Sequence, residues 1–137
     1  MSPTYVSRRL RLQVTERASG RCEYCLLSAV DAFFPHEADH IIAEKHGGAT
    51  TIGNLALACF DCNRFKGSDI ASLDPLTGDV VALFNPRTQR WNDHFSLNAG
   101  LVVALTPCGS ATVRLLKLNL AARVEVRAVL TSRGRYP

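Results

Sequence analysis

The stretch that decides the fold begins with Cys22-Glu23-Tyr24-Cys25 and continues, at residues 36–67, with HEADHIIAEKHGGATTIGNLALACFDCNRFKG. It contains two Cys-x-x-Cys pairs, and the second is Cys59 with Cys62. Each pair can bend into a short knuckle that presents two thiolates about 2.3 Å from one ion, so four sulfurs complete a tetrahedral Zn²⁺ site. Such a closed shell has no open position for water or substrate. We therefore expect this zinc to hold the fold and the chemistry to lie elsewhere.

Two disulfides or a cluster of free thiols are the alternative use of these cysteines. The chain begins Met1-Ser2-Pro3 and shows no secretory signal, and paired knuckles favour a metal over disulfides. We expect a free, packed thiol at the fifth cysteine, Cys108. The structural zinc would then take Cys22, Cys25, Cys59 and Cys62.

The insert between the knuckles, residues 26–58, is 33 residues long and exceeds the spacing of a compact zinc ribbon. Residues 33–42 end in the apolar, β-branched pattern of a strand, and the glycines at 47 and 48 break that pattern into a loop. Residues 55–59 form a second short apolar run, and Asn63 begins a helix after the second knuckle. The predicted order is strand, loop, strand, helix.

These residues resemble the HNH endonucleases, which carry a ββα-metal site. The similarity rests on Asp39-His40, thirteen residues, Asn54, eight residues, and then Asn63 directly after the second Cys-x-x-Cys. It continues through LFNPRTQRWNDHF and LTPCGSATVRLLKLN, which look like the tail of one HNH subfamily. A lone Asp-His or Cys-x-x-Cys would be a weak signal, whereas their joint spacing is a strong one.

The resemblance implies an α+β fold with a ββα-metal (HNH) core and Cys₄ zinc knuckles. We expect one HNH nuclease domain over residues 1–137, with the core at about 18–70 and a C-terminal extension at about 71–137. An N-terminal helix, a C-terminal β-hairpin and further helices would pack on this core.

The resemblance also implies a metal-dependent DNA endonuclease or nickase that leaves 5′-phosphate and 3′-hydroxyl ends. His40 is the expected general base, because an imidazole can take a proton from water near neutral pH. Asp39 and Asn63 would offer oxygen ligands to a catalytic Mg²⁺ or Mn²⁺, which typically takes one or two protein oxygens and a substrate phosphate. By analogy with the family, Asn54 would hold the loop and orient His40.

Nucleic-acid contacts are expected from His46 in the glycine-flanked loop, and from Arg64 and Lys66 beyond the second knuckle. The expected partner is DNA, in double-stranded form. His36 is expected to be exposed and His94 to be structural.

Composition and charge are compatible with a single nuclease domain. The chain has 137 residues and is 47% apolar, which fits one domain with a modest core. No apolar run approaches the about 18 residues of a membrane span, so we expect a soluble cytoplasmic protein with no membrane partner. The net charge of +4 is mild, but arginines cluster, as at Arg8, Arg9 and Arg11, and suit phosphate contacts. A solvated surface is the alternative.

The flanking segments predict the remaining elements. Residues 5–18 have a helical apolar stripe at Val6, Leu10, Val14 and Ala18, which we expect to pack on the zinc core. Strands are predicted at residues 80–84 and 100–105, a helix capped by Thr106 opens at Pro107, and a second helix covers residues 120–130. Residues 132–137 are expected to be frayed.

Two other functions compete with the nuclease. One is a zinc-knuckle nucleic-acid-binding module without turnover, and the other is an assembly component that kept an unused site. Binding alone does not require Asp39, His40, Asn54 and Asn63 together, which argues against the first.

Overall fold

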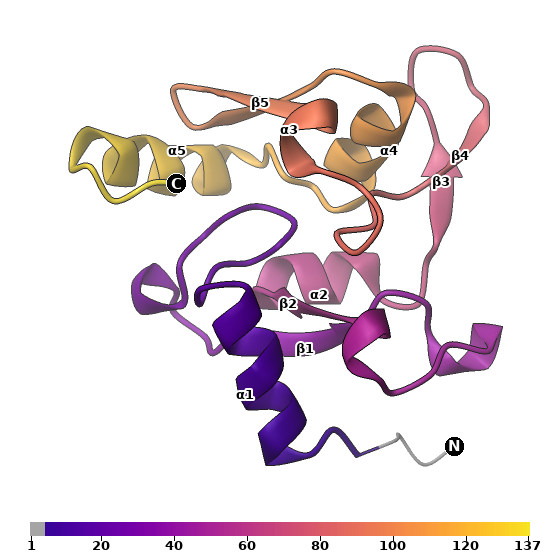
Figure 1. Ribbon diagram of the computed structural model, residues 1–137. Helices are drawn as coiled ribbons and strands as arrows, with labels where there is room; N and C mark the ends of the chain where they lie inside the picture. Colours follow the sequence, from indigo (N-terminus) through magenta and orange to yellow (C-terminus); the bar gives the residue numbers. More distant parts are fainter. Residues whose placement is uncertain (1–4) are drawn as a thin grey trace.

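The computed structural model describes residues 5–137 as a mixed α+β structure, which confirms the predicted fold class (Figure 1). The α-helices are α1 (Arg8–Arg17), α2 (Phe60–Lys66), α3 (Trp91–His94), α4 (Pro107–Leu115) and α5 (Ala121–Ser132). The strands are β1 (Glu37–His40), β2 (Leu55–Ala58), β3 (Ala71–Leu73), β4 (Val80–Ala82), β5 (Phe95–Asn98) and β6 (Leu101–Ala104). Short 3₁₀ helices are η1 (Ala29–Asp31), η2 (Glu44–His46) and η3 (Ile52–Asn54).

The β1–β2 hairpin is the centre of the N-terminal half. Its strands are antiparallel, with Asp39 opposite Ala56 and His40 opposite Leu55. All four residues of β2 are buried, because both faces of the hairpin are covered. Ala56 and Ala58 belong to the core that contains the four knuckle cysteines. The order strand, loop, strand, helix predicted from the sequence is confirmed over residues 37–66.

Helix α1 covers the opposite face of this hairpin. Ser7 caps it by accepting a hydrogen bond from the Leu10 backbone N–H at 3.1 Å. The predicted stripe is confirmed, but it packs on Leu55 and Leu57 in a separate apolar cluster rather than on the zinc core. The reason is the two-residue alternation of β2, which turns its leucines to α1 and its alanines to the cysteines.

The C-terminal extension consists of two further hairpins and three helices. Strand β4 is shorter than expected and pairs with β3, a strand that the sequence did not predict. Strand β6 confirms the strand expected at residues 100–105, but its hairpin partner is β5, which the sequence did not predict, and the short helix α3 before β5 was not predicted either. Thr106 caps α4 by accepting from the Gly109 backbone N–H at 3.0 Å, as expected. A side chain at Gly100, where φ is +88°, would meet the Val124 carbonyl of α5, so only glycine fits that turn.

The C-terminal extension forms the upper part of the molecule in Figure 1 and lies against the first knuckle. Arg87 pairs with Glu23, and the Trp91 indole N–H donates to the Tyr24 carbonyl at 2.9 Å. The Tyr136 hydroxyl donates to the Cys25 carbonyl at 2.6 Å, and its side chain is buried. The expectation of a frayed end is therefore wrong, because Tyr136 is anchored in the core beside the first knuckle.

Candidate functional site: a cysteine cluster and an adjacent catalytic pocket

The four knuckle cysteines form one buried cluster. The sulfurs of Cys22, Cys25, Cys59 and Cys62 all lie within 4.8 Å of one another. Ligands about 2.3 Å from a tetrahedral ion stand ~3.8 Å apart, and the Cys25 and Cys59 sulfurs are 3.6 Å apart. Backbone N–H groups of Cys25 and Cys62 donate to the first sulfur of their own knuckle, at 3.4 Å each. The cluster can therefore bind one metal ion, and its donor set is that of a structural zinc.

A cation from α5 lies against the thiolates. The Arg123 guanidinium donates to the Cys62 sulfur at 3.0 Å and also to the Leu116 carbonyl at 2.7 Å. Burial by itself lowers the pKa of Arg123, but the negative charge of Cys62 and Cys25 outweighs burial and raises it. Arg123 therefore stays charged and offsets the excess negative charge of four thiolates around a divalent ion.

A pocket of about 390 Å³ lies beside the hairpin and is lined by β1, α2 and the loop that follows β1. It brings together Asp39 and His40 from the end of β1 and Asn63 from α2. The sequence assigned these three residues and Asn54 to the catalytic site, and the pocket lining includes the three but not Asn54. Glu44 and Lys45 complete the loop side of the pocket.

The His40 side chain is half-buried and held at one ring nitrogen. Its Nε2 is hydrogen-bonded to the Thr50 hydroxyl at 2.8 Å. The other nitrogen, Nδ1, makes no hydrogen bond to another residue within the described range 5–137. Sequence reasoning did not identify Thr50, because a threonine in a turn before η3 carries no signal of its own.

Asn54 braces the loop between β1 and η3. Its amide oxygen accepts from the Ile42 N–H at 3.0 Å, and its amide nitrogen donates to the carbonyls of Ile42 and Ala49 at 2.9 and 2.8 Å. A side chain at Gly48 would meet the Ile42 carbonyl at 1.7 Å, so the loop requires glycine there. Asn54 does not bond to His40. Its bond to the Ala49 carbonyl holds the residue before Thr50, which is the hydrogen-bond partner of His40.

Asp39 lies at the floor of the site, with two partners that sequence reasoning missed. Its Oδ2 accepts from the Tyr24 hydroxyl at 2.9 Å and pairs with Lys66 Nζ at 3.1 Å. Burial raises the pKa of the Asp39 carboxyl, while the positive charge of Lys66 partly offsets that rise. Burial and the neighbouring Asp39 charge also raise the pKa of Tyr24, so its phenol stays protonated and donates.

Lys66 differs from its expected role as a nucleic-acid contact. Only 2% of its side chain is exposed, and Nζ also donates to the His40 carbonyl at 3.0 Å. A phosphate contact would require Lys66 to leave Asp39, so this position does not fit the expectation. The helical spacing held a signal: Cys62 and Lys66 are four residues apart on α2, so both face inward.

Comparison with known families supports the same segment. Residues 22–69 match the family model described as HNH endonuclease. This segment is similar to the HNH endonucleases. The match confirms the resemblance inferred from the sequence and supports nuclease activity in general. No curated protein and no solved structure matches the chain.

The donors of the HNH pocket fit a hard divalent cation. Asn63 makes no side-chain hydrogen bond to another residue within the described part of the chain. Asp39 Oδ1 has only a long contact of 3.5 Å with Lys66. A carboxylate oxygen and an amide oxygen are ligands that Mg²⁺ and Mn²⁺ accept. Asp39 and Asn63 could therefore hold such an ion together with a substrate phosphate.

The other three histidines, His36, His46 and His94, each make a hydrogen bond. His46 is exposed beside the pocket, with Nε2 hydrogen-bonded to the Ser68 carbonyl at 3.1 Å. His36 is not simply exposed as expected, because Nε2 bonds to the Leu27 carbonyl at 2.8 Å and Nδ1 is buried. His94 bonds to the Thr106 hydroxyl at 2.7 Å and packs beside Phe84, which agrees with the structural role expected for it.

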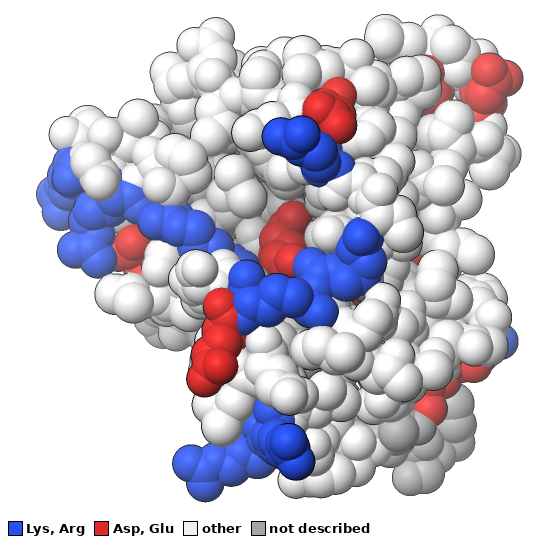
Figure 2. Space-filling view, viewed as in Figure 1, with Lys and Arg blue, Asp and Glu red and all other residues white. Residues whose placement is uncertain are grey.

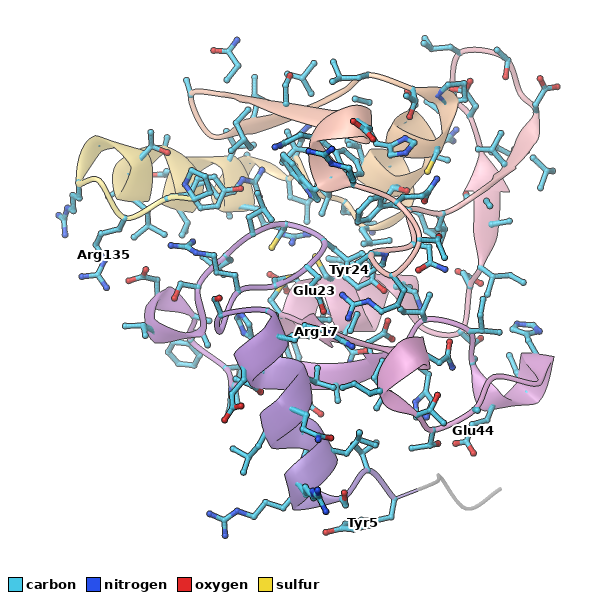
Figure 3. All side chains as sticks on the ribbon, in the orientation of Figure 1. Tyr5, Arg17, Glu23, Tyr24, Glu44 and Arg135 are labelled. Atoms are coloured by element: carbon cyan, nitrogen blue, oxygen red, sulfur yellow. The ribbon has the colours of Figure 1, made fainter. Side chains whose placement is uncertain are left out.

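Basic side chains gather on the face shown in Figure 2, in a band from α5 to the middle of the molecule and in a second group over α1. The α1 group contains Arg8, Arg9 and Arg11, which are all exposed. Figure 3 labels Arg17 near the centre of this face, where it donates to the Ile52 carbonyl at 2.7 Å. Among residues 5–137, no helix combines the length and apolar character that a membrane crossing requires.

Proposed function

We propose that this protein is a metal-dependent DNA endonuclease or nickase that hydrolyses phosphodiester bonds to 5′-phosphate and 3′-hydroxyl ends. The observation that carries the proposal is the single pocket that brings together Asp39, His40 and Asn63 within the HNH segment. A general base and two oxygen donors in one pocket are what phosphodiester hydrolysis requires.

His40 is the general base of the proposed reaction. In the proposed reaction, Nε2 keeps the ring proton in its hydrogen bond with the Thr50 hydroxyl at 2.8 Å, so Nδ1 is left to accept a proton from the attacking water. The hydroxide oxygen bonds to phosphorus, the bond from phosphorus to the 3′ oxygen breaks, and the 3′ oxygen takes a proton from solvent. Asn54 keeps the loop, and therefore Thr50, in place.

Asp39 and Asn63 hold Mg²⁺ or Mn²⁺ in this proposal. When bound, the ion supplies positive charge to the scissile phosphate and to the leaving oxygen. Tyr24 and Lys66 fix the Asp39 carboxylate from below, so its orientation does not depend on the ion. The zinc at the cysteines stays outside the reaction, because its four ligands close its shell.

Supercoiled plasmid DNA with added Mg²⁺ or Mn²⁺ tests the proposal. The native chain should cut, brief EDTA treatment should stop cleavage, and fresh Mg²⁺ or Mn²⁺ should restore it while zinc content stays constant. His40→Ala should lose about 10²–10⁴-fold in rate with its zinc retained. Asn63→Ala should require more metal, whereas Asn92→Ala, an exposed asparagine on α3, should behave as the native protein.

A zinc-knuckle nucleic-acid-binding module without turnover is the alternative. It would bind DNA but leave the plasmid intact with either metal. Cleavage that survives His40→Ala at the native rate would remove His40 as the base, and His46, the other histidine beside the pocket, would be the next candidate.

A further inference from the structure

Three phenylalanines lie together on the surface beside the zinc knuckles. Phe33 is 94% exposed, and Phe34 and Phe60 are 48% and 40% exposed. The ring centroids of Phe33 and Phe34 are 4.9 Å apart, and those of Phe34 and Phe60 are 4.6 Å apart. We call these rings, together with Arg64, the aromatic platform. Exposed apolar groups of this size that lie side by side mark a binding surface.

Positive charge surrounds the aromatic platform. The Arg64 guanidinium lies 5.4 Å from the centre of the Phe60 ring and 4.7 Å from that of Phe65, and its side chain is 59% exposed. Lys117 lies 4.9 Å from the centre of the same Phe65 ring. The platform therefore presents aromatic faces and cations to the same ligand.

The two carboxylates that line the cavities at the aromatic platform, Asp31 and Asp61, are each paired with arginine. Asp31 pairs with Arg135 at 2.6 Å, and Figure 3 shows Arg135 close to the loop that carries η1. Asp61 lies 3.8 Å from Arg123 and 4.0 Å from Arg64. Arg64 and Lys117 are both exposed, and these two surface cations favour an anionic ligand.

The cavities at the aromatic platform are small and open to solvent. One of about 220 Å³ lies among Phe33, Phe34 and Phe60, and one of about 270 Å³ lies between Phe33 and α5. Both are below the about 300–1,000 Å³ typical of small-molecule sites. A flat ring laid on the exposed Phe33 face fits this surface better than an enclosed ligand does.

Helix α2 and strand β1 connect the aromatic platform to the proposed active site. Phe60 and Arg64 lie on α2, the helix whose Asn63 lines the catalytic pocket. Phe33 and Phe34 precede β1, which ends at His40. A seven-residue helix is about 10 Å long. A nucleic-acid strand with one phosphate in the pocket therefore has its neighbouring nucleotides within reach of the platform.

We infer that the aromatic platform stacks unpaired bases of a single-stranded segment next to the cleavage site. This inference rests on the proposed action on DNA and names a substrate class, DNA that contains unpaired nucleotides. Base stacking on aromatic side chains combined with backbone contacts to cations is how single strands are bound without sequence preference.

Fluorescence anisotropy without added Mg²⁺ or Mn²⁺ tests the inference on a labelled blunt duplex and on the same duplex with a single-stranded tail. The native chain should bind the tailed DNA more tightly. Phe33→Ala should weaken tailed binding about tenfold and leave blunt binding unchanged. Leu76→Ala, which truncates another highly exposed apolar side chain in the β3–β4 connection, should change neither.

Equal affinity of the native chain for blunt and tailed DNA would overturn the inference, as would an equal loss on both in Phe33→Ala. A native dimer that Phe33→Ala converts to a monomer, measured by light scattering, would assign the platform to a second copy instead. Because binding is read without turnover, a chain that stacks bases but never cuts plasmid would refute the proposed function and leave this inference standing.

Discussion

Replacing Lys66 by methionine tests the buried ion pair beneath the pocket that contains His40 and Asn63. Lys66 Nζ contacts Asp39 Oδ2 at 3.1 Å and the His40 carbonyl at 3.0 Å. The side chains of Lys66 and Asp39 are 2% and 5% exposed, so neither charge is solvated. Removing one partner of such a pair typically costs about 3–5 kcal/mol, because the other charge is left buried and alone. For a chain of this length, Tm should fall by roughly 10–15 °C.

The pH dependence of this loss follows from the pKa of Asp39. Burial raises the pKa of the carboxyl in the folded state, and Lys66 opposes that rise. In Lys66→Met the folded pKa should therefore lie further above the unfolded one. The folded variant then binds more protons than the unfolded chain, so the destabilisation is complete above the folded pKa and shrinks as pH falls through it.

Urea unfolding followed by circular dichroism, with zinc present throughout, measures the effect. Arg64→Met is the matched control on the same helix, because the exposed Arg64–Asp61 pair at 4.0 Å should contribute less than about 1 kcal/mol. Adding Asp39→Asn to Lys66→Met should recover part of the loss, since the lone charge is gone. A Lys66→Met loss no larger than that of Arg64→Met would refute the argument from burial.

Three further outcomes are expected. Cys59→Ser should lose zinc and unfold the core, because a structural zinc site contributes on the order of 10 kcal/mol to the folding free energy of small domains. A variant that is free of zinc by elemental analysis but folded by circular dichroism would contradict this. Thr50→Val should lower kcat about tenfold or more and shift the pH profile of kcat, while KM and zinc content stay unchanged. The control Thr51→Val, at the exposed neighbouring residue, should leave kcat and its pH profile unchanged. Identical pH profiles for the two variants would remove Thr50 as a positioning residue. Tyr136→Phe should lower the free energy of unfolding in urea by about 1 kcal/mol, because its bond to the Cys25 carbonyl is lost; an unchanged value would mean that this bond does not stabilise the fold.

The spacing of the residues determined the local organisation around the metal. Two knuckles must each place two sulfurs on one ion, so cysteines that are three apart define their own turns. The order strand, loop, strand, helix then follows from short apolar runs and glycine breaks. Thr106 before Pro107 likewise predicted the start of α4, because a helix cap depends only on residues one turn away. The roles of Asp39, His40, Asn54 and Asn63 stay predictions until cleavage is measured.

Only the tertiary structure determined which distant residues contact the residues singled out from the sequence. Periodicity shows which face of a helix is apolar but not what covers it, so the α1 stripe met Leu55 and Leu57 instead of the cysteines. A lysine is expected at the surface unless a carboxylate neutralises its charge. Only the packing of β1 against α2 brings Asp39 to Lys66. The Tyr136 hydroxyl reaches the Cys25 carbonyl across 111 positions for the same reason. Contacts of such separation depend on how the whole chain closes, and no local pattern encodes them.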